Sequence, residues 1–394
     1  MAQALDEPVS LHAVVGHEEA RASLARAHRR QLLPAALLLH GPRGVGKQRV
    51  ALWLAQLLVC ARPQLEPCGS CPACRMALGL EHPDIHWYFP IPRPKNATGD
   101  TLVDALEQAR VEEIAELRLS PLRASHSEDV RGLYLGTVRN IRSKAHMRPV
   151  TAPGPIFIVG EAEHLVPQES SPEAANALLK LLEEPPGATR FILTSSEPGR
   201  LLPTIRSRTV PLHLGPLPRS VVADFLLKDA AVDPKKASWA AALGQGSPGR
   251  ALGFLPDGDE KGPLERLRRR AFELVAAAMS PGASEGYGLA LGFPPTGARG
   301  LVDLFDFVEE WVRDLAAVAA GVPSAALNHD AVPELERRVR EAKVGAFAVA
   351  RAFGSVERAR ELAWANVNPQ LVVGGLIRDL RGALRAGVPD GAAA

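Results

Sequence analysis

The segment GPRGVGKQ, from Gly41 to Gln48, has the spacing of a loop that binds phosphate groups. In such loops, backbone N–H groups cradle the phosphates, a lysine contacts the outer ones, and a following Ser or Thr hydroxyl holds Mg²⁺. Gly41, Gly44 and Gly46 give the backbone its freedom here, and Lys47 is placed for the outer phosphates. Gln48 stands where the hydroxyl is expected. The segment predicts a nucleotide site without one metal ligand, or a glycine turn that only joins a strand to a helix.

The second usual ligand of Mg²⁺ is an acidic residue at the end of a buried strand. The apolar run PIFIV, residues 155–159, is followed by Gly160 and Glu161, where proteins of this type commonly have Asp and Glu. Glu161 could still polarise a water molecule, but both usual metal ligands are absent. We therefore expect weak binding of ATP or ADP, without a firmly held Mg²⁺ and without turnover.

All four cysteines of the chain, Cys60, Cys68, Cys71 and Cys74, lie within fifteen residues. In a reducing compartment this spacing favours metal binding over disulfides. Four thiolates close a tetrahedral Zn²⁺ site and leave no position for a reactive water, so the metal would be structural. Four unrelated buried cysteines and an iron–sulfur cluster are the alternatives, and nothing else in the sequence indicates electron transfer. We expect a zinc-bound knob over residues 60–74.

The 394 residues are enough for two or three domains, and 46% of them are apolar. Lys and Arg total 46 against 44 Asp and Glu, so contact with DNA would need a local basic face. The chain has no uninterrupted apolar run of membrane-spanning length, and its first ten residues lack the basic start and apolar core of a signal peptide. We expect a cytoplasmic protein without membrane contact.

Three short apolar runs, at residues 35–41, 155–159 and 190–194, predict buried strands of a parallel sheet. Between the last two, a helix is expected with Ser171 as its N-cap, Pro172 at its first position and a stop at Pro185. Strands that alternate with helices indicate an α/β domain. The strand pattern is lost after Leu214.

The sequence divides into three expected domains. Residues 1–214 form the α/β domain, with the cysteine knob at 60–74 and a polar surface insertion at 96–130 that includes a helix near 101–117. Residues 215–258 form a small helical domain, and residues 259–394 a second helical domain with an apolar stripe through 301–315. The basic run Arg266–Arg270 is interpreted as a solvated face, and DNA contact there as less favoured. For Arg139, Arg142, Lys144 and Arg148, ordinary solubility is slightly favoured over a place on a DNA path.

The block from Ser171 to Thr209 closely resembles the bacterial clamp-loader AAA+ subunits of DNA polymerase III, in which ANALLKxLEEPP precedes a Ser-Arg-Cys motif. The phosphate loop, the cysteine knob and HPDIH at residues 82–86 fit the same family. The HPD segment and the missing metal ligands resemble the delta-prime type rather than the hydrolysing gamma/tau type. Thr209 replaces the usual cysteine. The resemblance covers residues 10–90 and 133–255 well, and the C-terminal third only in its helical character and in WANVNPQL at 364–371.

This resemblance implies an AAA+ P-loop domain with a parallel sheet, a small helical lid and an all-α C-terminal collar. It implies a hetero-pentamer with gamma/tau and delta subunits, within the DNA polymerase III holoenzyme, that loads the sliding clamp on primed DNA. Delta-prime typically acts as the stator of that ring. Arg208 is the implied arginine finger, which would enter the ATP site of a neighbouring subunit; such a group is worth about 10³–10⁵ in rate.

The resemblance also implies which residues would surround a nucleotide. Val15 and Gly16 would begin the adenine contacts, Thr194 or Ser195 would be the first sensor, and Arg250 would be the sensor arginine of the lid. The full expected set is Val15, Gly16, Gly41, Gly44, Val45, Gly46, Lys47, Gln48, Glu161, Thr194 and Arg250.

Two other functions stay open at this point. One is an active gamma/tau-like ATPase, which would need functional replacements for Gln48 and Gly160. The other is a zinc-dependent nucleic-acid-binding module with an incidental P-loop, which leaves the Ser171–Thr209 block unexplained.

Overall fold

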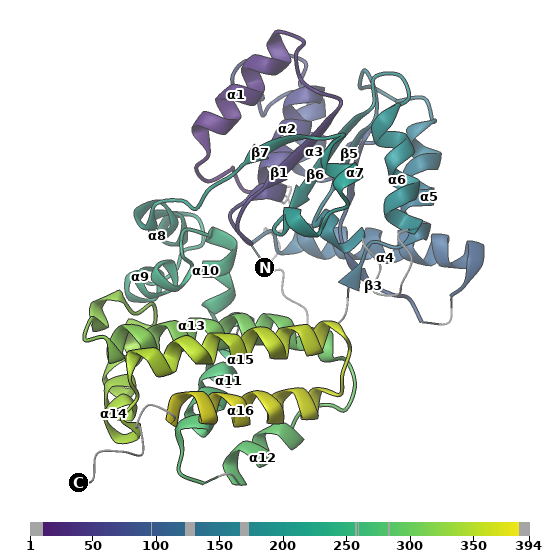
Figure 1. Cartoon of the computed structure of the whole chain (residues 1–394). Coiled ribbons are helices and arrows are strands. Elements are labelled where there is room, and N and C mark those ends of the chain that lie inside the picture. The colour runs from purple at the N-terminus through teal and green to yellow at the C-terminus, as the bar shows by residue number, and fades with distance from the viewer. Residues whose placement is uncertain are drawn as a thin grey trace, which may run out of the picture. The chain divides into compact units, whose positions relative to one another are not determined.

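A computed structural model describes residues 11–95, 97–122, 131–165, 173–256, 258, 260–282 and 284–385. Its described residues form two compact units, one over 11–122 and 131–252 and the other from 253 onward. Each unit has buried apolar side chains of its own, and Figure 1 shows the elements that carry them. The predicted fold class, a parallel-sheet AAA+ domain followed by a largely helical region, is confirmed. The three-domain division at residues 214 and 258 stays a prediction.

The first unit is built on a five-stranded parallel sheet with the order β2-β5-β6-β1-β7. Its strands are β1 (Ala36–His40), β2 (Ile85–Tyr88), β5 (Ile156–Val159), β6 (Arg190–Ser195) and β7 (Val210–His213). The three predicted strands, β1, β5 and β6, are confirmed. The sequence analysis missed β2 and β7, because these edge strands are only partly buried and show no continuous apolar run. A short antiparallel pair, β3 (Ile91–Pro92) with β4 (Arg131–Gly132), lies outside the main sheet.

Successive residues of the central strands point to opposite faces of the sheet, and both faces are covered by helices. Leu37 and Leu39 lie in one core cluster with α1 (Glu18–Arg29) and α2 (Lys47–Val59). Leu38 lies in the other, with α5 (Leu135–Ala145) and α6 (Glu173–Glu183). Figure 1 shows these two helical layers on either side of the strands. The apolar runs are continuous because neither face of a central strand meets water.

Helix α6 is the helix that was predicted between the strands at residues 155–159 and 190–194. The described helix ends at Glu183, before Pro185, as expected. The predicted N-cap Ser171 and the following Pro172 lie outside the described residues. The remaining helices of this unit are α3 (Pro72–Leu78), α4 (Gly99–Leu119), α7 (Pro203–Arg206), α8 (Arg219–Lys228), α9 (Pro234–Leu243) and α10 (Pro248–Phe254), of which residues 248–252 belong to this unit.

The polar segment near residue 100 is attached more firmly than its sequence indicates. The helix expected there is confirmed as α4, and its Leu106 is buried. Glu107 on α4 accepts hydrogen bonds from Lys144 Nζ at 2.6 Å and from Arg110 Nη2 at 2.6 Å. Arg110 in turn donates to the Trp87 carbonyl oxygen at the edge of the sheet. These charged contacts fix α4 to α5 and β2.

The second unit is helical over its described residues. Its helices are α11 (Pro263–Met279), α12 (Ser284–Leu291), α13 (Val302–Ala319), α14 (Val332–Ala342), α15 (Ala346–Trp364) and α16 (Pro369–Arg385). Helix α13 packs against α11 and α15. The apolar stripe predicted along residues 301–315 is buried, which confirms it: Leu301, Leu304, Phe305, Val308, Trp311, Val312 and Leu315.

The interpretation of Arg266–Arg270 as a solvated face is wrong for Arg268, whose side chain is only 6% exposed. Its Nε donates to Asn328 Oδ1 at 2.6 Å, and its other nitrogens bond Glu265 and Asp330. The guanidinium also lies over the ring of Trp311. In a helix, consecutive residues point in different directions, so one member of a basic run can be buried while its neighbours are solvated.

Replacement of Glu107 by Gln should make the protein less sensitive to acid. Burial by itself would raise the pKa of Glu107, but the hydrogen bonds from Arg110 and Lys144 outweigh it and lower the pKa to about 2. The resulting stability is complete above the ordinary Glu pKa of about 4.3 and is lost as the pH falls from there towards 2. We expect Glu107→Gln to cost about 1–3 kcal/mol near neutral pH and little at about pH 2. Urea unfolding at both pH values measures this.

The matched control is Glu112→Gln, an exposed position on the same helix. An equal loss of stability for Glu107→Gln at neutral and acidic pH would contradict the electrostatic origin of the effect.

Candidate functional site

The predicted phosphate loop lies between the end of β1 and the start of α2. Its glycines have left-handed backbone angles, with φ of 151° at Gly41, 77° at Gly44 and 108° at Gly46. A Cβ atom added to Gly41 would lie 2.0 Å from the carbonyl oxygen of Leu214. Both the backbone angle and this close approach therefore require glycine at position 41.

Lys47, the predicted phosphate ligand, is bonded to its own loop. Its side chain is buried, and Nζ donates to the carbonyl oxygens of Gly41 at 2.9 Å and Pro42 at 2.8 Å and to Ser196 Oγ at 2.9 Å. Burial lowers the pKa of Lys47 to about 8, against the opposing charges of Glu163 and Glu161. An ammonium group has three donors, and all three have partners here. Contact with a phosphate would require Lys47 to give up at least one of them.

Gln48 stands at the position where the usual motif has its metal-binding hydroxyl, and its amide is bonded within the protein. Its Oε1 accepts a hydrogen bond from Trp87 Nε1 at 3.0 Å, and its Nε2 donates to Glu161 Oε1 at 3.4 Å. A Cβ atom added to Gly160 would lie 2.9 Å from the Gln48 side chain. The two departures from the usual motif are therefore adjacent in space, and the glycine makes room for the amide.

Glu161 and Thr194, both expected near a nucleotide, are brought together at the carboxyl ends of β5 and β6. Glu161 has a left-handed backbone with φ of 49°, and its N–H donates to Thr194 Oγ1 at 3.0 Å. Glu163, which follows on the same turn, is buried and accepts from the N–H of Ser196 at 2.9 Å. Its second oxygen, Oε2, has no hydrogen-bond partner among the described residues.

The sequence analysis did not select Glu163, Ser196 or Trp87. Glu163 and Ser196 each lie within a few residues of a predicted strand end, which is the signal that could have identified them. Trp87 belongs to β2, an edge strand that the apolar pattern did not reveal.

The backbone of α10 contacts the phosphate loop directly. The N–H of Gly249 donates to the carbonyl oxygen of Gly44 at 2.9 Å, and a Cβ atom on Gly44 would lie 2.6 Å from the backbone nitrogen of Arg250. The side chain of Arg250 donates through Nε to the Leu243 carbonyl oxygen at 3.2 Å. The main chain of Arg250, the predicted sensor arginine, therefore lies next to the phosphate loop, whereas its side chain bonds to Leu243.

Val15 and Gly16 belong to a segment that flanks the same loop. Gly16 has φ of 66°, and a Cβ atom there would lie 2.5 Å from the Leu217 side chain. The next residue, His17, donates through Nε2 to the carbonyl oxygen of Val45 at 2.9 Å. The structure thus brings together the predicted residues from 15–16, 41–48, 161, 194 and 250.

Arg208, the predicted arginine finger, follows α7 on the surface of the first unit, where its side chain is 34% exposed. Its guanidinium forms an ion pair with Glu183 at the end of α6 and donates to the Thr204 carbonyl oxygen at 3.0 Å. The replaced cysteine position, Thr209, is buried, and its hydroxyl donates to the Ile205 carbonyl oxygen.

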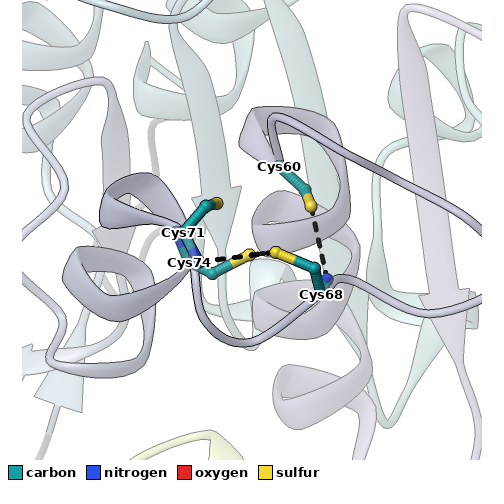
Figure 2. Close-up of side chains that lie close together, drawn as sticks. All are labelled: Cys60, Cys68, Cys71 and Cys74. Carbon is teal, nitrogen blue, oxygen red and sulfur yellow. Dashed lines mark hydrogen bonds between the residues drawn. The ribbon is translucent and has the colours of Figure 1, made fainter.

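The four cysteines converge, as Figure 2 shows, from the end of α2, the following loop and the start of α3. All four Sγ atoms lie within 4.8 Å of one another, and those of Cys68 and Cys74 are 3.9 Å apart. A tetrahedral site with metal–sulfur bonds of about 2.3 Å has sulfurs about 3.8 Å apart. The cysteines are free, so the cluster could hold a metal ion.

Backbone N–H groups point at these sulfurs. The N–H of Cys68 donates to Cys60 Sγ at 3.3 Å, and the N–H of Cys71 donates to Cys68 Sγ at 3.4 Å. The hydrogen bond from Cys71, followed by one from Ser70, lowers the pKa of Cys68 to about 5. The lowered pKa favours the thiolate of Cys68, which is the form that binds a metal, whereas burial raises the pKa of the Cys74 thiol.

The HPD segment has a structural role in this chain. Asp84 is buried and accepts hydrogen bonds from the N–H groups of Val150, Thr151 and Ala152 at 2.7–2.8 Å. Burial would raise the pKa of Asp84, but these donors lower it below the ordinary value. The carboxylate ties the segment before β5 to the start of β2.

Comparison with known proteins places these features in a family. A family model described as "DNA polymerase III, delta subunit" matches residues 16–218, just over half of the chain. The delta-prime subunits of Pseudomonas aeruginosa and Escherichia coli K12 are 34% and 30% identical, over 54% and 56% of this chain and 53% and 54% of theirs. The gamma/tau subunit of Mycobacterium bovis is 35% identical over 55% of this chain and 30% of its own. The chain thus spans about half the length of these delta-prime relatives and a smaller share of the gamma/tau relative.

Among solved structures, a gamma-subunit-related protein of Thermotoga maritima aligns with 93% of this chain and all of its own, at 15% identity and a TM-score of 0.41. None of the helices in the described ranges is long and apolar enough to span a membrane. The sequence match over residues 16–218 decides the assignment: the chain belongs to the DNA polymerase III delta-subunit family and is a delta-prime-like member of it.

Proposed function

We propose that this chain is the non-hydrolysing stator of a DNA polymerase III clamp loader, in a hetero-pentamer with gamma/tau and delta subunits that loads the sliding clamp on primed DNA. The observation that carries the proposal is the carboxamide of Gln48, which fills the space beside Gly160. The family assignment supports the assembly, and the Gln48 contacts support the lack of hydrolysis.

Mg²⁺ requires an octahedral shell of oxygen ligands at about 2.0–2.1 Å. The Gln48 amide offers one oxygen, and that oxygen already accepts from Trp87. Its nitrogen faces Glu161, the remaining carboxylate at the strand end. Without the metal, the charge that develops on a transferred phosphoryl group is not neutralised, so the site is unsuited to hydrolysis.

Nucleotide binding should also be weak, because the loop is bonded to the protein itself. Lys47 uses its donors on Gly41, Pro42 and Ser196, and the Gly44 carbonyl oxygen accepts from Gly249. A phosphate oxygen only accepts hydrogen bonds, so ATP or ADP would have to draw Lys47 away from its present acceptors. A loop closed in this way suits a rigid part of the ring.

Arg208 is the residue that we propose to act in the neighbouring subunit. Among the described contacts, its exposed guanidinium has a surface ion pair with Glu183 and donates to the Thr204 carbonyl oxygen on α7 and to the Ser207 hydroxyl. A surface ion pair is worth about 0–1 kcal/mol, whereas an arginine supplied to a transferring phosphoryl group contributes about 10³–10⁵ in rate. Exchange of Glu183 for a phosphate therefore costs little.

The four cysteines are proposed to hold a structural Zn²⁺. Four thiolates at tetrahedral spacing saturate zinc and leave no site for a water molecule, so the metal would stabilise the fold without taking part in a reaction. The hydrogen bond from the Cys71 N–H to Cys68 Sγ supports the thiolate form of Cys68.

The double substitution Gln48→Thr with Gly160→Asp should create a metal site. Threonine supplies the hydroxyl, its shorter side chain leaves room for the aspartate, and both groups are Mg²⁺ ligands in P-loop proteins. We expect Mg²⁺ to strengthen ATP binding about tenfold or more in this variant and not in the unmodified chain, measured by calorimetry. Gln48→Thr alone is the control and should show a smaller gain.

The unmodified chain should show no Mg²⁺-dependent ATP hydrolysis. Steady turnover by the pure protein would favour the alternative function, an active gamma/tau-like ATPase, over the stator.

Arg208→Ala should leave the loader assembled but lower its clamp- and DNA-dependent ATP hydrolysis several-fold, because the neighbouring catalytic site loses its finger. The measurement is the ATPase rate of the reconstituted complex. Arg206→Ala, at another exposed arginine of the same segment, is the matched control. Equal rates for the Arg208 variant and the unmodified complex would exclude the finger role.

The purified chain should contain one Zn²⁺, as measured by elemental analysis. Its removal by a chelator should lower the melting temperature by several degrees, because the metal cross-links segments that carry little core of their own. The variant Cys71→Ser should lose the ion. Stoichiometric iron, or no metal at all, would refute the assignment.

A further inference from the structure

Glu66 links the cysteine knob to the helices beneath it. It lies in the loop between Cys60 and Cys68, and its two carboxylate oxygens have different partners. Oε2 accepts from the indole Nε1 of Trp53 on α2 at 2.5 Å, and Oε1 accepts from Arg21 Nη1 on α1 at 2.5 Å. The side chain of Glu66 is 55% exposed, but that of Arg21 is only 14% exposed. One carboxylate thus fastens an exposed loop to two partners in the body of the unit.

Arg21 continues the connection towards the phosphate loop. Its Nε donates to the carbonyl oxygen of Gly16 at 3.3 Å, while its guanidinium lies over the Trp53 ring. The next residue, His17, donates to the Val45 carbonyl oxygen within the phosphate loop. A continuous set of polar contacts therefore runs from the loop between the first two cysteines, through Arg21, to Val45.

The position of Glu66 depends on the knob, because its loop has little else to hold it. Most of residues 61–67 are exposed, including Leu65 at 47%. Both ends of the loop are cysteines of the cluster, and the N–H groups of Arg62 and Cys68 bond to Cys60 Sγ. A metal bound by Cys60 and Cys68 closes this short loop and removes much of the entropy that its ordering costs.

An ion pair with one solvent-exposed partner, here Glu66, contributes about 0–1 kcal/mol. The contact between Glu66 and Arg21 is therefore too weak to order the loop by itself. Once a bound metal orders the loop, however, this contact can hold Arg21 in one position. The buried Trp53 adds a second point of attachment for the same carboxylate.

We propose that the metal-bound cysteine knob fixes the segment Val15–His17, and through it the phosphate loop, with Glu66 and Arg21 as positioning residues. The inference rests on the metal site proposed above and is independent of the stator and arginine-finger roles. The knob would then have a function inside the subunit. The bound metal keeps the segment Val15–His17 ordered beside the phosphate loop, and loss of the metal makes this segment more mobile.

Hydrogen–deuterium exchange of the intact chain, with zinc bound and after chelation, tests the coupling. Removal of the metal should increase exchange at residues 13–21 and 41–48, whereas α6, on the other face of the sheet, should not change. Glu66→Gln should raise exchange at residues 13–21 up to about fivefold while one zinc per chain is retained. Glu66→Asp, which keeps the charge, should restore part of the protection.

Gln64→Ala, at an exposed position in the same loop, is the matched control and should behave like the unmodified chain. Exchange at residues 13–21 that is the same with and without zinc would overturn the inference, as would a zinc-loaded Glu66→Gln chain with unmodified exchange. Loss of zinc from Glu66→Gln would also overturn it, because Glu66 would then support the knob rather than transmit its order. Absence of zinc from the purified chain would instead refute the metal site itself, which elemental analysis distinguishes.

Discussion

The Gln48 side chain lies against the bare backbone of Gly160, and the proposed lack of hydrolysis depends on this packing. Any side chain at position 160 would begin 2.9 Å from the amide, so the glutamine and the glycine must be present together. The Trp87 indole and the Glu161 carboxylate satisfy the two ends of the amide. A half-buried polar group is costly unless it is bonded, and this amide is bonded at both ends. The packing of the Gln48 amide against Gly160 is therefore a stable part of the fold.

Buried polar side chains with hydrogen-bond partners also join helices elsewhere in the molecule. In the second unit, the fully buried Asp314 accepts the N–H groups of Leu327 and Asn328, and Asn328 in turn accepts from Arg268. In the first unit, Glu107 fixes α4 to α5. Removal of one partner from such a network leaves a buried charge uncompensated, which is why these residues specify the packing of helices.

The proposed roles of the first unit depend on where the hydrogen-bond partners of its polar groups lie. The phosphate loop accepts hydrogen bonds from Gly249, from His17 and from Lys47, all within the same unit. These contacts stabilise a single closed arrangement of the loop. Arg208 differs from them, because its partners lie on the surface and an exposed ion pair is easily exchanged. This contrast between a closed loop and an easily exchanged arginine is what the proposed stator role requires.

Sequence alone determined the features that depend on local pattern. The glycine spacing predicted the loop between β1 and α2, continuous apolar runs predicted β1, β5 and β6, and the cysteine spacing predicted a cluster that could hold a metal ion. The stripe of α13 also followed from its period, because burial of one helix face imposes that period directly. These features are decided by residues within a few positions of each other.

Tertiary structure decided the features whose partners are distant in the chain. Lys47 meets Ser196 across 149 positions, and Gln48 meets Glu161 across 113. The burial of Arg268, the structural use of Asp84 and the edge strands β2 and β7 were likewise not evident from local pattern. An edge strand has only one neighbour and a partly wet face, so its burial pattern is weak. A polar side chain shows no sign in the sequence of whether the fold will bring it a partner or leave it in water, because that partner is chosen by the packing of the whole unit.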